Sequence, residues 1–444
     1  MNLPKDFETF FRERWDAAAL DALLSSLQGE PSVSIRLNPA RLPIDLEPED
    51  ADGRVPWCPE GIYLKSRPSF TADPLLHSGA YYVQEASSMF LSHVLRTIFH
   101  SSFFTFHSQA VLDLCAAPGG KSTMLRSLLP DDCLLVSNEP LRARAQVLAE
   151  NMAKWGHPNM VVTQTYASEI AHLIERNRHL SKGFDLILAD VPCSGEGMMR
   201  KEEEAVRQWS PSFVAECAAL QRSIIADIWP ALRAGGFLIY STCTFNPEED
   251  EENVEWIARE LGADIQTIPV DPAWGIVGDQ RKEKRGGEEK SEKSTMEFCH
   301  FLPGQVRGEG FFCAVLRKHG SEATEDDAPA VKKEKKMKQG KGRKAAPTTL
   351  AEAVGEWLPT LPTDLLDDAE APRVELSLSD SIRYLQREAL VLPVDAPRGL
   401  VQVCYQGQRL GLVKNLGSRA NNLYPKEWRI RTTHVIPHSL FAYQ

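Results

Sequence analysis

Two cysteines provide the clearest chemical signal in this sequence. Cys193 and Cys243 each follow a short apolar run of strand type, within the segments Asp190-Val191-Pro192-Cys193 and Ser241-Thr242-Cys243. A thiolate is a strong nucleophile, and surroundings that lower its pKa activate it. Because ligands of open parallel sheets bind beyond the carboxyl ends of the strands, we expect both sulfurs in one site. The alternative is that both are small packing residues, the commonest role of a free cysteine.

The other cysteines outside the small-residue loop fit a packing role. Cys217 shares a helical face with Phe213, Leu220 and Ile224. We expect packing roles also for Cys58, Cys133, Cys299, Cys313 and Cys404. The odd total of nine, without framework spacing, indicates a reducing compartment. None lies in a CxxC pair, so we expect no metal.

A loop of small residues offers a candidate cofactor site. The segment from Val111 to Leu129 reads as strand, loop and helix, the first half of a Rossmann-like unit. Glycine lets a ligand approach the backbone, and a helix start offers free N–H groups. The spacing matches neither GxGxxG nor GxxxxGK, so an ordinary turn stays open as the alternative. The candidate cofactor-binding residues of this loop are Cys115, Ala116, Ala117, Pro118, Gly119, Gly120 and Lys121.

Acidic residues end two of the expected strands. Glu139 lies about twenty residues past the glycines, where an acid typically binds ribose hydroxyls. This position favours a ligand with a free ribose diol, such as a nucleoside or S-adenosylmethionine, although a surface acid at a strand end is the alternative. Asp190 ends the fourth strand, directly before Cys193. We therefore expect Glu139, Asp190, Cys193 and Cys243 to converge near the small-residue loop.

The elements that must position these residues alternate between strand and helix. This alternation predicts a mostly parallel sheet with helices on both faces. Expected strands are Val111–Leu114, Leu134–Ser137, Met160–Thr163, Phe184–Ala189, Phe237–Tyr240 and a closing strand, Gly310–Leu316. Expected helices are Leu141–Trp155, one from Ser210-Pro211 to about Arg233, and one opened by Asn246-Pro247 with Glu248–Glu252 near its positive end.

The flanking segments predict further units, which give domain boundaries at 1–75, 76–318, 319–348 and 349–444. The first is a small α/β unit, 319–348 is a charged linker, and the last resumes globular composition. Expected elements are a helix Phe7–Leu27, a strand Ser32–Leu37, a helix to Phe99 capped by Ser87 or Ser88, a flexible insertion Gln280–Ser294, and strands Leu400–Tyr405 and Gln408–Val413 around a Gln406-Gly407 turn.

Composition sets the broad class. The chain has 444 residues, of which 43% are hydrophobic and 25% charged, as is normal for a soluble globular protein. We find no apolar run of bilayer length and no signal peptide, so we expect a cytoplasmic protein without a membrane partner. The net charge of −11 does not by itself indicate a nucleic-acid partner. Basic residues nevertheless gather in Lys332–Lys344 and in Arg398–Arg431, and the second segment falls in folded-looking sequence.

Three segments together resemble the Nop/Sun family of RNA 5-methylcytosine methyltransferases. They are DLCAAPGGKS, ADVPCSGEGMMRK and YSTCTFNPEEDEENV, and YYVQEASSM matches the family's entry motif. The resemblance runs from about Ser34 to about Lys318. It implies the α/β class, with a Rossmann-like class I methyltransferase sheet and an RNA-binding-type N-terminal unit. The tail segments RGEGFF and GLVKNLGSRANNLYPKEWRIR resemble the bacterial small-subunit ribosomal RNA methyltransferase F group, which carries a C-terminal PUA-like, β-rich RNA-binding domain.

The resemblance implies S-adenosylmethionine as cofactor, RNA as substrate and a role for each cysteine. Cytosine carbon 5 is a weak nucleophile until the Cys243 thiolate adds to carbon 6, and the family assigns the later release to the cysteine matching Cys193. Asp190 is expected to hold the polar edge of the cytosine and to touch the cofactor. Such chemistry needs the base out of any stack. Lys121 and Lys201 are candidates for polar contacts in the site.

One departure and several alternatives accompany this interpretation. The family usually has an aspartate after the third strand, where this chain has Tyr166. A nicotinamide-dependent oxidoreductase would need the missing GxGxxG and gives the cysteines no role. A non-catalytic RNA-binding or assembly factor is a third hypothesis. Within the family, transfer RNA is the alternative to ribosomal RNA or the small subunit, and a monomer is the expected state.

Overall fold

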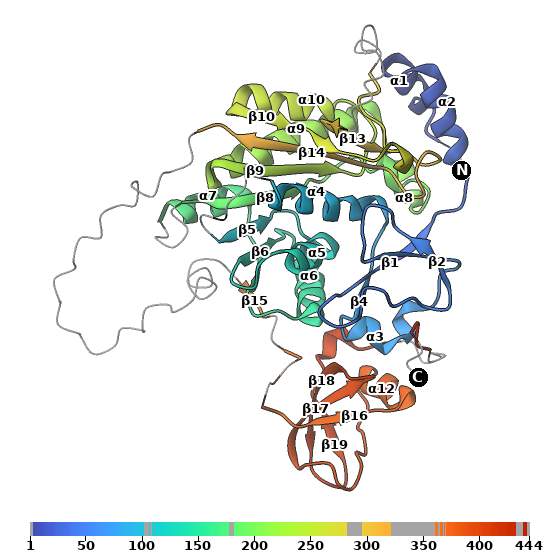
Figure 1. The fold of residues 1–444 in the computed structure, drawn as a ribbon, viewed down its shortest axis with the longest axis vertical. Helices are drawn as coiled ribbons and strands as arrows, with labels where there is room; N and C mark the ends of the chain where they lie inside the picture. Colours follow the sequence, from blue (N-terminus) through green and yellow to red (C-terminus); the bar gives the residue numbers. More distant parts are fainter. Residues whose placement is uncertain are drawn as a thin grey trace, which may run out of the picture.

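The computed structural model describes residues 3–101, 106, 109–176, 182–281, 295–320, 360–362, 365–366, 368, 370–431 and 438–441 (Figure 1). Most of the expected insertion Gln280–Ser294 and of the expected linker 319–348 therefore lies outside the described residues. Among the described residues, no helix combines the length and apolar character needed to cross a bilayer.

The N-terminal segment forms two helices, α1 (Phe7–Arg14) and α2 (Ala17–Ser26), so the prediction of one helix over Phe7–Leu27 is wrong. The break has a local cause. Asp16 is extended, and its side chain accepts hydrogen bonds from the N–H groups of residues 18 and 19, which caps α2. Trp15, between the two helices, is buried.

A four-stranded antiparallel sheet follows. Its order is β2 (Ala51–Arg54), β3 (Gly61–Leu64), β1 (Val33–Leu37) and β4 (Tyr81–Val83), with η1 (Phe70–Ala72) and α3 (Pro74–His77) between β3 and β4. β1 confirms the strand expected at Ser32–Leu37. The boundary at residue 75 stays a prediction, and β4 pairs with β1 beyond it.

The helix that ends at Phe99 is α4 (Phe90–Phe99), preceded by the 3-10 turn η2 (Ser87–Met89). Neither expected serine caps it. The Ser88 hydroxyl donates to the Glu85 carbonyl oxygen, and the Ser87 hydroxyl donates to the carbonyl oxygen of Glu309, far along the chain. Ser87 therefore joins two distant segments instead of ending a helix.

Among the described residues the central sheet has nine strands, and its core confirms the predicted α/β class. Five parallel strands form its middle: β5 (Ala110–Asp113), β6 (Leu134–Asn138), β7 (Met160–Thr163), β8 (Phe184–Asp190) and β9 (Leu232–Thr242). Antiparallel strands complete it: β10 (Ala263–Gln266), β13 (Phe298–Phe301), β14 (Phe311–Lys318) and β15 (Thr360–Leu361). The order is β10-β14-β9-β8-β5-β6-β7-β15, with β13 paired to β14. A separate pair joins β11 (Ile268–Pro269) to β12 (Thr295–Met296).

Helices cover both faces of this sheet, as expected (Figure 1). Val111 of β5 packs into one apolar cluster and Leu112 into another on the opposite face. The helical elements that lie between its strands in sequence are α5 (Gly120–Leu128), α6 (Arg142–Trp155), α7 (Ala167–Arg176), η3 (Glu196–Met198), α8 (Glu203–Gln208), α9 (Pro211–Ile228), α10 (Glu251–Trp256), the π-helical η5 (Ile257–Gly262) and η6 (Pro272–Trp274).

The cap and first-turn pair of α9 is confirmed, because the Ser210 hydroxyl accepts from the Phe213 N–H and Pro211 occupies the first turn. The expected end at Arg233 is wrong. α9 ends at Ile228, and the 3-10 turn η4 (Trp229–Ala231) follows. Pro230 has no N–H to continue the helical ladder, which explains the stop.

In the part that the structure describes, the C-terminal unit contains a four-stranded sheet and the helix α12. Its order is β16 (Arg373–Glu375), β17 (Gly399–Tyr405), β18 (Gln408–Asn415) and β19 (Ala420–Asn422), with α12 (Leu378–Leu385) and the turn η9 (Lys426–Trp428). The predicted hairpin is confirmed. Gln406 and Gly407 both have positive φ, as a two-residue hairpin turn requires.

This C-terminal unit docks beside the N-terminal sheet and the end of α6 (Figure 1). Arg409 donates to the Ala153 carbonyl oxygen at 3.1 Å, and Gln408 donates to the Arg41 carbonyl oxygen at 2.9 Å. The unit is thus fixed against a helix whose other end lies at the candidate cofactor loop.

Candidate functional site

The small-residue loop joins β5 to α5 and is held from two sides. Gly119, the residue before α5, has φ of 116°, a left-handed conformation that favours glycine. Arg144 of α6 donates to the Ala117 carbonyl oxygen at 3.1 Å. From the N-terminal sheet, Arg36 donates to the Gly120 carbonyl oxygen at 3.2 Å. The first turn of α5 is therefore fixed while its N–H groups face the carboxyl edge of the sheet.

A buried acid lies beneath this loop. Asp113 ends β5, and its Oδ2 accepts from the Ser122 hydroxyl of α5 at 2.6 Å. Its other oxygen has no hydrogen-bond partner among the described residues. Burial, as the main cause, raises the pKa of Asp113 to about 7, and neighbouring Asp190 contributes.

Glu139 follows β6 and is almost fully buried. Its Oε1 accepts from the Leu141 N–H at 3.0 Å, which fixes the side chain at the start of α6. Its Oε2 lies 3.3 Å from Nη1 of Arg144, an ion-pair distance, but receives no hydrogen bond. One acceptor atom at the end of the second strand is thus available for a hydroxyl ligand.

Asp190 ends β8 between two donors. Lys121 Nζ lies 2.7 Å from its Oδ2, and the Ser241 hydroxyl donates to its Oδ1 at 2.8 Å. Burial opposes the charge of Lys121, but attraction to Asp190 and to Cys243 outweighs it, so the Lys121 pKa is raised. A half-buried cation, a carboxylate and a thiol therefore act on one another at this edge.

The two predicted thiols meet. Cys193 Sγ lies 3.2 Å from Cys243 Sγ, and both residues are partly exposed free cysteines. The hydrogen bond to Cys243, followed by burial, raises the pKa of Cys193 well above its ordinary value. Cys193 therefore keeps its proton at neutral pH and can donate it toward the Cys243 sulfur.

The remaining cysteines divide as the sequence predicted. The six assigned a packing role are all buried, and Cys115 in the loop is the third partly exposed cysteine of the chain. The three partly exposed thiols therefore all follow a strand of the central sheet at its carboxyl end.

Two other residues considered in the sequence analysis, Lys201 and Tyr166, lie away from the residues that contact the thiols. Lys201 Nζ is 3.4 Å from Glu309 Oε1 and Arg200 Nε is 2.7 Å from Glu309 Oε2, so Lys201 belongs to an ion cluster around a buried carboxylate. Tyr166 has 63% of its surface exposed, and its N–H donates to Glu169 beside the end of β7.

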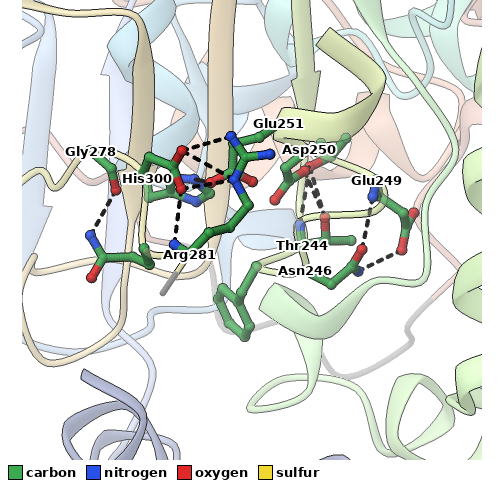
Figure 2. Close-up of polar contacts among 12 residues, drawn as sticks. Thr244, Asn246, Glu249, Asp250, Glu251, Gly278, Arg281 and His300 are labelled. Atoms are coloured by element: carbon green, nitrogen blue, oxygen red, sulfur yellow. Dashed lines mark hydrogen bonds and ion pairs between the residues drawn. The ribbon is translucent and has the colours of Figure 1, made fainter. Parts of the chain in front are cut away.

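The structure adds two carboxylates that the sequence interpretation did not assign. Glu196 and Glu249 are fully buried and lie beside the two thiols. Figure 2 shows Glu249 and Asn246 pointing toward each other, and Asp250 toward Thr244. Because these side chains hold residues 246–250 in turns, α10 begins at Glu251, and the prediction that Asn246-Pro247 opens the helix is wrong. The adjacency of both glutamates to the cysteine motifs was the available signal.

Among the described residues, the structure holds no group of three or more His, Cys, Asp or Glu side chains arranged to bind a metal. The polar groups of the site instead suit a nucleoside-like ligand and nucleophilic chemistry: an available acceptor at Glu139, a glycine loop at a helix start, and paired thiols beside a cation.

The parallel sheet with this carboxyl-edge site defines a Rossmann-like methyltransferase. Three family models match successive parts of the chain: the N-terminal domain of 16S rRNA methyltransferase RsmF over residues 3–86, 16S rRNA methyltransferase RsmB/F over residues 105–317, and the methyltransferase RsmF PUA domain over residues 371–430. The chain belongs to the RsmF family of methyltransferases.

Curated relatives share the name ribosomal RNA small subunit methyltransferase F. The protein from Salmonella agona is 31% identical, over 96% of each chain. The protein from Shewanella loihica is 30% identical, over 84% of this chain and 83% of the relative. The protein from Cronobacter sakazakii is 34% identical over 72% of this chain, which spans 64% of that relative.

Solved structures share the fold. A methyltransferase homolog protein from Pyrococcus horikoshii superposes with a TM-score of 0.55 at 24% identity, over 71% of this chain and 95% of that one. NSun6 from Pyrococcus horikoshii gives 0.54 at 19% identity, over 72% and 99%. These findings confirm the resemblance, the fold class and the enzyme class predicted from the sequence, and they support ribosomal over transfer RNA.

Proposed function

We propose that this chain is an S-adenosylmethionine-dependent enzyme that makes 5-methylcytosine in small-subunit ribosomal RNA. The observation that carries the proposal is the 3.2 Å separation of the Cys193 and Cys243 sulfurs at the ends of adjacent strands. Two thiols this close can act on one pyrimidine ring, one from carbon 6 and one at carbon 5.

Cys243 is the proposed nucleophile. Its sulfur lies 3.2 Å from the Cys193 sulfur and near the ammonium of Lys121, so a thiolate formed at Cys243 would have a hydrogen-bond donor and a positive charge beside it. Addition of the sulfur to carbon 6 moves electron density to carbon 5, which then takes the methyl group. Carbon 5 then carries both the methyl group and its original proton.

Cys193 serves the release step. Once Cys243 is bound to carbon 6, its sulfur is no longer a thiol partner of Cys193, and Cys193 gives its proton to solvent. The Cys193 thiolate is then the base that takes the carbon 5 proton. The electron pair of that C–H bond re-forms the ring double bond as the Cys243 sulfur departs. One proton reaches solvent per turnover, and Cys193 is again a thiol beside a Cys243 thiolate.

The chain's residues fit the cofactor. Bound S-adenosylmethionine supplies an electrophilic methyl group on a sulfonium sulfur. Glu139 Oε2, buried without a hydrogen bond, is the proposed acceptor for a ribose hydroxyl. The backbone of residues 115–121 is the proposed cradle. Asp190 keeps Lys121 and Ser241 while retaining lone pairs for the cytosine amino edge, because an ionised carboxylate accepts about four hydrogen bonds.

The proposed roles of the units follow the domain boundaries expected from the sequence. The units 1–75 and 349–444 bind RNA, 76–318 carries the chemistry, and the protein acts as a cytoplasmic monomer. Seven basic residues against one acidic residue between Arg398 and Arg431 support the C-terminal role.

Methyl transfer to defined RNAs tests the proposal. The purified chain is incubated with radiolabelled S-adenosylmethionine and with small-subunit ribosomal RNA, assembled small subunits or transfer RNA. We expect label in 5-methylcytosine of the ribosomal substrate, and bisulfite sequencing of RNA from a deletion strain to lose that mark. Label confined to transfer RNA would overturn the substrate assignment.

A further inference from the structure

The loops that carry the two thiols exchange carboxylate contacts. We name residues 191–198, after β8, the first cysteine loop and residues 243–250, after β9, the second cysteine loop. Glu196 of the first loop reaches into the second, and Glu249 of the second reaches into the first. A direct backbone bond joins them as well, from the Gly197 N–H to the Cys243 carbonyl oxygen at 2.8 Å.

Glu196 fixes the backbone just after Cys243. Its Oε2 accepts from the N–H groups of Phe245 and Asn246 at 2.8 and 3.1 Å. Its Oε1 accepts from the indole N–H of Trp209 at 2.8 Å, which anchors the carboxylate from outside both loops.

Glu249 fixes the backbone just after Cys193. The Ser194 N–H lies 3.0 Å from its Oε2 and 3.3 Å from its Oε1. Gln221 of α9 donates to Oε2 at 2.6 Å and to the Pro192 carbonyl oxygen at 2.9 Å, so it holds both flanks of Cys193.

Asn246 joins the two carboxylates. Its amide nitrogen lies 2.9 Å from Glu196 Oε1 and 2.8 Å from Glu249 Oε1, and its oxygen accepts from the Glu249 N–H at 2.9 Å. No ion pair to either glutamate occurs among the described residues. Burial raises the pKa of Glu196 to about 8 and also raises the pKa of Glu249, so two buried carboxyls with only neutral donors are costly for the fold. Their backbone donors, the N–H groups of Ser194, Phe245 and Asn246, lie within three residues of a thiol in sequence.

We propose that Glu249 and Glu196 are positioning residues for separate steps of the reaction proposed above, with Glu249 placing Cys193 for release and Glu196 placing Cys243 for addition. The inference rests on that proposed function. It predicts opposite effects of two chemically identical substitutions, because each carboxylate fixes the backbone beside a different thiol.

The test uses the full chain with small-subunit ribosomal RNA and S-adenosylmethionine, followed by a denaturing gel. Glu249→Gln is expected to accumulate at least fivefold more covalent protein–RNA adduct than wild type, as is expected of Cys193→Ala. Glu196→Gln is expected to lose turnover without adduct. Glu248→Gln is the matched control, because Glu248 belongs to the second cysteine loop but its carboxylate contacts Arg14 of α1. If Cys193→Ala accumulates adduct and Glu249→Gln does not exceed Glu248→Gln, the positioning role is overturned.

A second measurement needs no RNA and therefore separates this inference from the proposed function. Diamide oxidises two adjacent thiols to a disulfide and is itself reduced to the hydrazine, and mass spectrometry of linked peptides gives the rate for Cys193 and Cys243. We expect Glu249→Gln to slow this reaction at least fivefold and Glu248→Gln to leave it unchanged. An unchanged rate in Glu249→Gln contradicts the inference.

The change of charge in Glu249→Gln has the opposite effect on the rate of disulfide formation. Loss of the Glu249 charge lowers the pKa of Cys193 and so favours oxidation, which means that a slower reaction reports displacement of the thiol. If Glu249→Gln does not fold, Gln221→Met removes a donor to Glu249 and is expected to change both measurements in the same direction. Wild-type behaviour of a folded Gln221→Met protein then overturns the inference.

Discussion

Lys121 Nζ lies 2.7 Å from Asp190 Oδ2, which joins the first turn of α5 to the end of β8 beside both thiols. The two residues are 69 positions apart in sequence. Their charges largely cancel, yet Lys121 also acts on Cys243, so the pair supports an anionic sulfur without leaving a lone cation in the site.

Replacement of Lys121 by a neutral residue is expected to make the Cys243 thiol less reactive. Lys121→Met should lower the rate at which iodoacetamide alkylates Cys243 at pH 7 by roughly tenfold, the effect of about 1.4 kcal/mol of lost attraction. Peptide mass spectrometry measures the rate at each cysteine. Lys154→Met is the control, because Lys154 pairs with Glu150 on α6. Equal Cys243 rates in Lys121→Met and wild type would show that the cation does not activate the thiol.

Glu139 is expected to set the affinity for the cofactor. Glu139→Ala removes an acceptor with charge, a contact typically worth about 1.5–3 kcal/mol, so Kd for S-adenosylmethionine should rise roughly 10- to 100-fold. Isothermal titration calorimetry measures it. Asp131→Ala, at a fully exposed side chain, should leave Kd unchanged. A normal Kd in Glu139→Ala would remove the ribose assignment.

Asp113 should make stability pH-dependent. Its pKa is raised from 3.8 to about 7, so the folded state binds more protons than the unfolded state between those values. The contribution of Asp113 to the free energy of unfolding is therefore fully present below about pH 4 and is lost as the pH rises to about 7. Asp113→Asn should gain stability relative to wild type over that window, by at most about 1.4 kcal/mol per pH unit.

Urea unfolding at pH 5, 6, 7 and 8 measures this difference. Asp227→Asn, at an exposed position of α9, should show no such trend. A difference between Asp113→Asn and wild type that stays constant with pH would mean that Asp113 ionises normally in the folded protein.

Arg409 is expected to orient the C-terminal unit on α6. Arg409→Ala removes the hydrogen bond to the Ala153 carbonyl oxygen and should raise KM for RNA several-fold while kcat at saturating RNA changes little. Steady-state methylation kinetics give both constants. Arg373→Ala, on the outer strand β16, is the control. A fall in kcat with constant KM would place the effect in the chemistry instead.

The spacing of apolar residues predicted the strands of the central sheet, and the residues that follow those strands predicted the edge that carries the site. The apolar runs before Cys193 and Cys243 identified both strands, and parallel strands end at one edge, so the thiols could be placed together. The break between α1 and α2 also has a signal in the sequence, because Asp16 is a strong N-cap residue. The amphipathic pattern continues across Asp16, however, and favours a single helix.

Contacts between distant segments could not be read in this way. The acidic run after Asn246 fits a helix start equally well, and its role in turns depends on Ser194, 55 residues away from Glu249. The partner of Lys121 depends in the same way on how β8 lies beside β5. Such pairings follow from strand order and side-chain direction, which local sequence does not specify.

The most direct test of the account is the attachment site of trapped RNA. Cys193→Ala, incubated with ribosomal substrate and S-adenosylmethionine, is predicted to give an adduct that survives denaturation, with the nucleotide on Cys243 by peptide mass spectrometry. The Cys193→Ala, Cys243→Ala double variant is predicted to give none. Absence of adduct in Cys193→Ala, or attachment to another residue, would contradict the roles assigned to the two thiols.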